Sequence, residues 1–405
     1  MAKIAVLGYG TVGSGVVEVM NINSSMIARR AGEEITIKYV LDLNDFPGTP
    51  AEKLIVHDFE QIVADEEIEL VVEVMGGIEP ANTFVRRSLE AGKSVVTSNK
   101  ALVAKHGAEL LKTAKEHHVN FLFEASVGGG IPIIRSLNNA LTGDEIEEIT
   151  GILNGTTNYM MTKMFYDGAD YDEVLKEAQD NGYAERNPEA DVEGYDACRK
   201  IAILSSVISG RYVNFEDIYT EGITKMTSRD ICYARKMGMT IKLLASAKRE
   251  DEKISAIVAP FLLLPSHPLY NIDGVFNSVF VKGNMLGDAM FYGSGAGKLP
   301  TASAVVGDIV DAVKNRGRDV MAAWTEEKLE LKSKGDAKRK FFVRMAGDKE
   351  ELLQKVEAAF GPVTVITLKD VSDEFGFITG RMKESIYEAM AAGFSNILHM
   401  IRVEE

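Results

Sequence analysis

The sequence predicts a three-part α/β protein: a doubly wound parallel sheet, an α+β domain and a small ferredoxin-like βαββαβ module. Three observations predict this class. Short apolar runs alternate with helical stretches through the first third of the chain, which is typical of buried parallel strands. From about Ile146 that alternation stops, as in α+β domains. The residues from 340 onward give the order β, α, β, β, α, β.

The domain boundaries follow from these patterns. The first domain spans residues 1–133, with strands in KIAVLGYG, IKYVLDL, ELVVEVMGG, SVVTSN and NFLFEASV, and is completed by a helix at about 300–316. Residues 134–299 form the second domain, with strands in EEITGILNG, KISAIVAPFLLL and SVFVKGN and a sheet that is antiparallel or mixed. Residues 317–339 are crowded with charge and predict a solvated linker before the module at 340–405.

Composition narrows the class of protein. The 405 residues exceed the size of one hydrophobic core, and 46% hydrophobic with 26% charged residues is typical of a globular chain. A net charge of -15 argues against nucleic-acid and membrane partners. No apolar run approaches the roughly 20 residues of a membrane span, and no signal peptide is expected. The only cysteines, Cys198 and Cys232, are predicted to be reduced and buried in a cytoplasmic protein.

A glycine-rich turn follows the first predicted strand. In GYGTVGSG, Gly8 permits a tight turn, Gly10 lets a pyrophosphate approach the backbone, and Gly13 allows close helix packing. The N–H groups of the helix start then face an anion. In this strand, turn and helix context the motif predicts a Rossmann dinucleotide site; a purely structural turn is the alternative.

Asp42 follows the second predicted strand, where the adenosine ribose of a dinucleotide is expected. Its carboxylate can accept hydrogen bonds from both ribose hydroxyls and would repel a 2'-phosphate. No Arg or Lys follows closely, so the sequence favours NAD over NADP. The alternative is an ordinary turn residue after a strand.

Lys200 precedes the apolar run IAILSSVI, so its neighbours on the same helix face are Ile203 and Leu204. Asp196 lies one turn before it. Burial disfavours the charged lysine and a carboxylate favours it, so their balance sets the lysine pKa. A surface ion pair is the alternative. Lys100, after the strand SVVTSN, lies at the carboxyl edge of the sheet, where open α/β folds bind ligands.

Seven motifs in order resemble those of homoserine dehydrogenases, over nearly the whole chain: GYGTVGSG, VMGG, TSNKALVA, EASVGGGIPII, GILNGTTNYM, GYAERNPEADVEGYDACRK and GAGKLPTASAV. The resemblance implies reversible NAD(P)-dependent interconversion of L-homoserine and L-aspartate 4-semialdehyde, in threonine and methionine biosynthesis. Two other functions stay open: a nucleotide- and amino-acid-sensing regulator without turnover, and a dehydrogenase of another small amino acid.

The resemblance also implies roles for individual residues. Lys200 would be the catalytic acid/base and Lys100 a second catalytic lysine. The substrate would be bound by Glu185, Asp196, Asn154 and Thr156, although the last two could equally be ordinary helix caps. The cofactor would be bound by Gly8, Tyr9, Gly10, Thr11, Val12, Gly13, Asp42, Gly76, Lys100, Gly182, Glu185 and Gly295.

A monovalent cation is implied by the motif EASVGGGIPII. By resemblance its ligands would be Glu124 and the backbone oxygens of Val127, Gly129 and Ile131, with sodium in a structural role. From the residues alone this stretch would be a loop.

The C-terminal module resembles the amino-acid-sensing ACT domain, which in many family members is linked to threonine. Here MAGDKEELL lacks the proline-and-glycine turn that is usual where the effector's backbone docks. Threonine as effector and a packing or association role therefore both stay open. We expect a homodimer or homotetramer, formed through the sheet of the middle domain.

Overall fold

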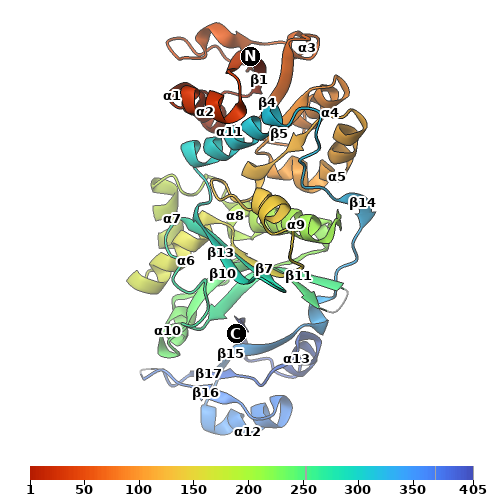
Figure 1. The fold of residues 1–405 in the computed structure, drawn as a ribbon. Helices are drawn as coiled ribbons and strands as arrows, with labels where there is room; N and C mark the ends of the chain where they lie inside the picture. The colour runs from red at the N-terminus through yellow and green to blue at the C-terminus, as the bar shows by residue number, and fades with distance from the viewer. Residues whose placement is uncertain (251–252, 370, 405) are drawn as a thin grey trace.

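A computed structural model describes residues 1–250, 253–369 and 371–404 (Figure 1). The N-terminal sheet and its helices lie at one end of an elongated molecule, the middle domain follows, and the C-terminal residues form the other end. Within the described residues, no helix combines the length and apolarity needed to cross a membrane. Cys198 and Cys232 are both free thiols; Cys198 is buried as predicted, whereas Cys232 is exposed.

The first sheet has six parallel strands in the order β3-β2-β1-β4-β5-β6, which confirms the predicted doubly wound parallel sheet. The five predicted strands are all present. The sixth, β3, has only two residues, too few for an apolar pattern to reveal it. The strands are β1 (Ala2–Leu7), β2 (Ile35–Leu41), β3 (Ile55–Val56), β4 (Ile68–Glu73), β5 (Ser94–Thr97) and β6 (Phe121–Leu122).

Helices cover both faces of this sheet. The long helix α11 (Lys298–Lys314) returns from the middle domain and packs on α1 and against β4 and β5. A Cβ on Gly15 of α1 would lie 2.8 Å from Lys298 O, so only glycine lets the two helices come this close. The other helices are α1 (Thr11–Ile22), α2 (Ser24–Ala31), α3 (Glu60–Val63), α4 (Ala81–Glu90) and α5 (Lys100–Glu116).

The second sheet is mixed and contains eleven strands, with the main path β13-β12-β7-β10-β11-β19-β15-β17-β16. The sequence had indicated three of its middle-domain strands, and β9, β10 and β13 are additional. These strands are β7 (Ile146–Ile152), β9 (Tyr219–Thr220), β10 (Thr240–Glu250), β11 (Lys253–Leu263), β12 (Phe276–Gly283) and β13 (Gly287–Ser294). The helices of the domain are α6 (Gly155–Asp167), α7 (Tyr171–Asp180), α8 (Glu189–Val192), α9 (Tyr195–Ser209) and α10 (Ser228–Lys236).

The C-terminal module has the predicted βαββαβ order, with one extra two-residue strand, β18. Its main sheet has the order β19-β15-β17-β16, and it has its own aromatic core around Phe341, Phe360 and Phe377. However, β19 also pairs in parallel with β11, so one sheet runs through both domains. The elements are β15 (Lys338–Ala346), α12 (Lys349–Phe360), β16 (Thr364–Ile366), β17 (Glu374–Ile378), β18 (Met382–Lys383), α13 (Glu384–Ala391) and β19 (Ile397–Glu404).

The segment 317–339 is not the fully solvated linker that its charge predicted. Trp324 and Leu329 are buried, and β14 (Thr325–Lys328) pairs with β8 (Arg211–Tyr212) of the middle domain. The charged side chains of β14 do face solvent, as its four residues are all exposed. A few large apolar residues therefore hold the segment to the protein. The sequence did not predict this, because charged residues dominate the composition of the segment.

Candidate active site

The glycine turn after β1 is shaped as the sequence predicted. Gly8 has φ +98°, and a Cβ on Gly13 would lie 2.0 Å from Gly8 O, so a side chain at either position would distort the turn. A Cβ on Gly10 would meet nothing within 4 Å, and no side chain caps the start of α1. Thr11 and Val12 form the first turn of that helix. The first N–H groups of α1 therefore remain as donors for an anion.

Asp42 directly follows β2 and lies against this turn. Its Oδ2 accepts from Tyr9 N at 2.8 Å and its Oδ1 from Asn44 N at 3.0 Å. Burial raises the pKa of Asp42, but these hydrogen bonds outweigh it and the pKa is lowered. The structure thus joins an ionised carboxylate to the glycine turn, where a ribose would require it.

The helices α5 and α9 bring the two predicted lysines together. They pack across the boundary between the first and middle domains. Lys100 is the first residue of α5, whose N-cap Asn99 accepts from Leu102 N. Lys100 Nζ donates to Asp196 Oδ1, and Lys200 Nζ lies 2.9 Å from Asp196 Oδ2. One carboxylate in the first turn of α9 therefore bridges two ammonium groups from different domains.

The end of β7 completes this cluster. Lys200 Nζ also donates to Leu153 O at 2.8 Å, and the next residue, Asn154, caps α6 by accepting from Thr157 N. Asn154 Nδ2 donates to both Asp196 Oδ2 (3.0 Å) and Asp191 Oδ1 (2.7 Å). Thus Asn154 is an ordinary cap and a member of the cluster at once. The cluster consists of Lys100, Asn154, Asp191, Asp196 and Lys200.

Burial and charge oppose each other in this cluster. Burial lowers the pKa of Lys200 and Asp196 raises it; the net shift is downward. For Asp196 the two lysines outweigh burial and hold the pKa well below its usual range. Burial raises the pKa of Asp191, against the hydrogen bond from Asn154. The cluster therefore holds a fully ionised carboxylate beside a lysine that loses its proton more readily than a free one, which suits proton transfer.

Other predicted residues lie around this centre. Gly76 lies in the loop after β4. The preceding residue of this loop, Met75, lies against the glycine turn: a Cβ added at Gly8 would be 3.2 Å from the Cα of Met75. Thr156 donates to Tyr183 O at 2.5 Å. Gly295 packs against Asn277 at the end of β13. In contrast, Gly182 and Glu185 are exposed in the loop between α7 and α8. No hydrogen bond or ion pair among the described residues links the Glu185 carboxylate to the cluster.

The predicted cation loop is mostly buried, with Gly130 and Pro132 exposed. Glu124 is 2% exposed, and its two carboxylate oxygens accept from Ile134 N (2.9 Å) and Arg135 N (2.7 Å). Burial raises its pKa. A Cβ on Gly129 would lie 2.4 Å from Gly295 O, so the loop packs tightly under the turn that follows β13. Val127 and Ile131 are buried in the same loop.

Sequence reasoning missed Asp191. It is one of several acidic residues in GYAERNPEADVEGYD, and no spacing distinguishes it from Glu185, Glu189 or Glu193. It also missed Glu73, fully buried at the end of β4, which accepts from Thr97 Oγ1 and Met75 N. An acidic residue inside the apolar run ELVVEVMGG was a signal that could have identified Glu73.

A doubly wound sheet with a glycine turn and a Lys–Asp–Lys cluster at its carboxyl edge defines a nicotinamide-dependent oxidoreductase. Comparison with known proteins gives the family. Residues 132–310 match the family model described as homoserine dehydrogenase, and residues 8–124 match the homoserine dehydrogenase NAD binding domain. The chain belongs to the homoserine dehydrogenase family.

Individual relatives agree with this assignment. A homoserine dehydrogenase of Mycobacterium bovis is 42% identical over 387 residues, which cover 92% of this chain and 88% of that protein. The crystal structure of a homoserine dehydrogenase from Thiobacillus denitrificans is 35% identical with a TM-score of 0.92, covering 100% of this chain and 98% of that one. A hyperthermophilic archaeal homoserine dehydrogenase in complex with NADPH is 29% identical with a TM-score of 0.66, covering 77% of this chain and 97% of that one.

Proposed function

We propose that the protein interconverts L-homoserine and L-aspartate 4-semialdehyde at the cluster between α5 and α9, with Lys200 as the acid/base. The observation that carries the proposal is the buried Lys200 ammonium, held by Asp196 and Leu153 O. An ammonium has three donors, and the described residues take two. The third is available for the hydroxyl oxygen of a substrate.

A bound nicotinamide supplies the hydride acceptor or donor. In the oxidation, neutral Lys200 takes the hydroxyl proton as the carbonyl forms; in the reduction, its ammonium returns that proton to the developing alkoxide. Asp196 keeps Lys200 and Lys100 in position and balances their charges. We assign the α-ammonium of the amino acid to Asp191 and Glu185, and its carboxylate to the N–H groups at the start of α6.

Asp42 supports NAD as the preferred cofactor, because it presents an ionised carboxylate beside the glycine turn. The archaeal relative described above binds NADPH, so this preference has to be measured. Initial rates with L-homoserine, using NAD and NADP in parallel, test both proposals. Fast turnover with NAD supports them, and equal or faster turnover with NADP contradicts the preference.

The test of the mechanism is Lys200→Ala. The proposed role requires that turnover is lost while reduced cofactor still binds, measured by fluorescence titration. A variant that keeps its turnover would contradict that role. Wild-type protein that binds the cofactor but turns over no L-homoserine would favour a regulator or another substrate.

We further propose a structural sodium site made by Glu124 and the carbonyl oxygens of Val127, Gly129 and Ile131. The donor set suits a hard cation, and a positive charge would favour the ionised form of Glu124, whose pKa burial raises. Sodium should therefore increase the melting temperature more than potassium or N-methylglucamine at equal ionic strength. Equal melting temperatures in the three salts would contradict the site.

For self-association we propose the β13 edge of the long sheet. It ends the strand order, and exposed apolar side chains lie on and beside it: Phe276, Met285, Leu286, Met290 and Tyr292. An unpaired apolar strand edge favours pairing with a second copy. Met290→Lys should lower the mass measured by sedimentation; an unchanged mass would exclude this edge.

A further inference from the structure

A buried ion-pair network lies where the C-terminal module meets the middle domain. At its centre is Arg402 of β19, which is 1% exposed. Its guanidinium donates to Glu384 Oε1 at 2.6 Å and, on the opposite side of the boundary, to Glu221 Oε2 at 2.7 Å. Glu221 directly follows β9 of the middle domain, whereas Glu384 begins α13. One arginine thus connects a carboxylate from each domain.

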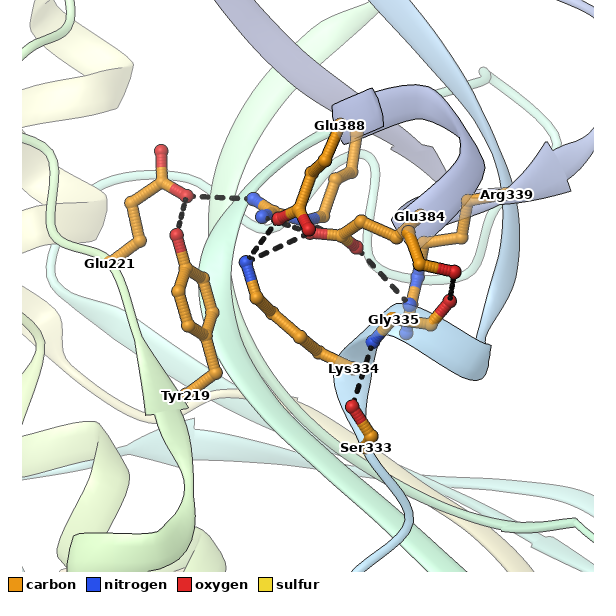
Figure 2. A network of polar contacts seen from close by, with 10 residues as sticks. Tyr219, Glu221, Ser333, Lys334, Gly335, Arg339, Glu384 and Glu388 are labelled. Carbon is orange, nitrogen blue, oxygen red and sulfur yellow. Dashed lines mark hydrogen bonds and ion pairs between the residues drawn. The ribbon is translucent and has the colours of Figure 1, made fainter. Parts of the chain in front are cut away.

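The surroundings hold this arginine in one position. Tyr219 donates to Glu221 Oε2 at 3.1 Å, and its ring centroid lies 5.1 Å from the Arg402 guanidinium carbon. Figure 2 shows Tyr219 and Glu221 facing Glu384 and Glu388 across the network, with Lys334 between them. Lys334 Nζ pairs with Glu388 at 2.7 Å. Because it is fork-shaped, a guanidinium can hold two carboxylates in fixed directions, which an ammonium does less well.

The residues after Glu221 lie directly against the turn between α8 and α9. A Cβ on Gly222 would lie 2.1 Å from Val192 O and 2.5 Å from Glu193 Cα. Ile223 N donates to Val192 O at 2.8 Å. The backbone of residues 221–223 therefore packs directly against residues 192 and 193. The contact is so close that a shift of one segment should displace the other.

The two acidic residues of the cluster lie on either side of that turn. Asp191 precedes Val192 at the end of α8, and Asp196 lies in the first turn of α9. Gly194, between them, packs on Thr220: a Cβ at Gly194 would lie 3.2 Å from Thr220 Cγ2. A continuous set of contacts therefore runs from the Arg402–Glu221 pair to the carboxylates beside Lys200.

We infer that Glu221 and Arg402 are positioning residues for the reaction: their ion pair, together with the pairing of β9 on β11, fixes residues 219–223, which in turn hold the α8–α9 turn beside Asp191 and Asp196. The C-terminal module thereby contributes to substrate binding without touching the substrate. The inference rests on the proposed function for its kinetic test. It predicts that weakening the pair acts mainly on L-homoserine and spares the cofactor, which the other domain binds.

Two variants and a matched control test this. Glu221→Gln keeps the shape of the side chain and removes its charge. Gly222→Ala forces residues 222 and 192 apart without changing any charge. The control is Glu404→Gln, which removes a carboxylate from the same strand as Arg402. Glu404 pairs with Lys248 of β10 at 2.5 Å, and no hydrogen bond or ion pair among the described residues joins it to residues 219–223. All three are compared for steady-state kinetics, cofactor binding and amide hydrogen exchange at residues 191–196.

We expect Glu221→Gln to lower kcat/KM for L-homoserine by about tenfold through a higher KM, because small displacements of positioned groups have effects of this size. Gly222→Ala should do the same, and cofactor affinity should not change. Amides 191–196 should exchange faster in both variants than in Glu404→Gln. Equal kinetics and exchange in Glu221→Gln and Glu404→Gln would overturn the inference. So would loss of activity in Gly222→Ala alone, since the ion pair would then be irrelevant.

Amide exchange separates this inference from the proposed function. If the wild-type protein does not turn over L-homoserine, the proposed activity fails, but exchange at residues 191–196 still shows whether Glu221 holds the turn. If the wild type is active and exchange in Glu221→Gln equals that of the control, the positioning role fails and the activity stands.

Discussion

Replacing Asp196 with asparagine is the sharpest single perturbation of the site. Asp196 pairs with Lys100 and Lys200 at once, and it is 2% exposed. Asp196→Asn keeps the shape of the side chain and the acceptor for one lysine, but it leaves two ammonium groups close together with no bridging charge. Lys100 is 43% exposed and can turn toward water. Lys200 is 9% exposed and cannot, so the effect falls on Lys200.

The structure indicates how much stability Asp196→Asn should lose and how that loss should depend on pH. Removing one partner of a buried ion pair costs about 3–5 kcal/mol of unfolding free energy, and an acid/base lysine whose pKa and position are disturbed should lower kcat by up to about 100-fold. Folding already lowers the pKa of Lys200. Between its folded and unfolded pKa values the unfolded chain binds more protons, so stability rises with pH. In Asp196→Asn the pKa of Lys200 in the folded protein falls further, so the pH range in which stability rises with pH extends to lower pH.

Two measurements check the prediction. Denaturant unfolding between pH 6 and pH 10 should show a steeper gain in stability with pH for Asp196→Asn than for the wild type. In homoserine oxidation, which needs neutral Lys200, the acidic limb of kcat/KM should move to lower pH. The comparison variant is Asp191→Asn, which should raise KM and move that limb less, because Asp191 raises the pKa of Lys200 more weakly than Asp196 does. An unmoved limb in Asp196→Asn, with normal cofactor binding, would refute the role of Asp196 in setting the lysine pKa.

Three further predictions concern the cofactor and the module. Asp42→Ser removes the carboxylate that accepts from Tyr9 N; KM for NAD should rise about tenfold while KM for NADP does not, and a parallel rise in both would count against a ribose contact. Gly13→Ala places a Cβ 2.0 Å from Gly8 O, so the unfolding free energy should fall by about 1–3 kcal/mol and cofactor affinity should fall, as calorimetry can measure. Added L-threonine should leave initial rates unchanged, because Asp348 already accepts from Glu350 N and Glu351 N at the start of α12; inhibition by threonine would contradict this.

Local patterns predicted the parts of the molecule that depend on neighbours in sequence. Strand β1, the glycine turn and the start of α1 are adjacent along the chain, so the sequence was enough to predict all three. The same holds for Asp196 and Lys200, which lie one helical turn apart. The βαββαβ order of the C-terminal module also follows from local apolar periodicity.

Features that depend on distant pairing could not be predicted. The parallel ladder between β11 and β19 uses backbone groups, which every residue carries, so no side-chain pattern marks it. Asp191 enters the cluster only because Asn154, far along the chain, donates to it. The prediction for the charged segment around β14 was wrong because a few buried apolar residues, Trp324 and Leu329 among them, outweigh many exposed charges.

The junction of β11 with β19 also bears on how the chain is made. The strand β11 lies in the middle of the sequence, yet its residues 261–263 pair with β19, the last strand among the described residues. During synthesis residues 261–263 of β11 have no partner on that side until β19 has been made, and open strand edges pair with other chains. Loss of β19 would therefore expose the backbone groups of residues 261–263 in the middle of the molecule, far along the chain from residues 397–404.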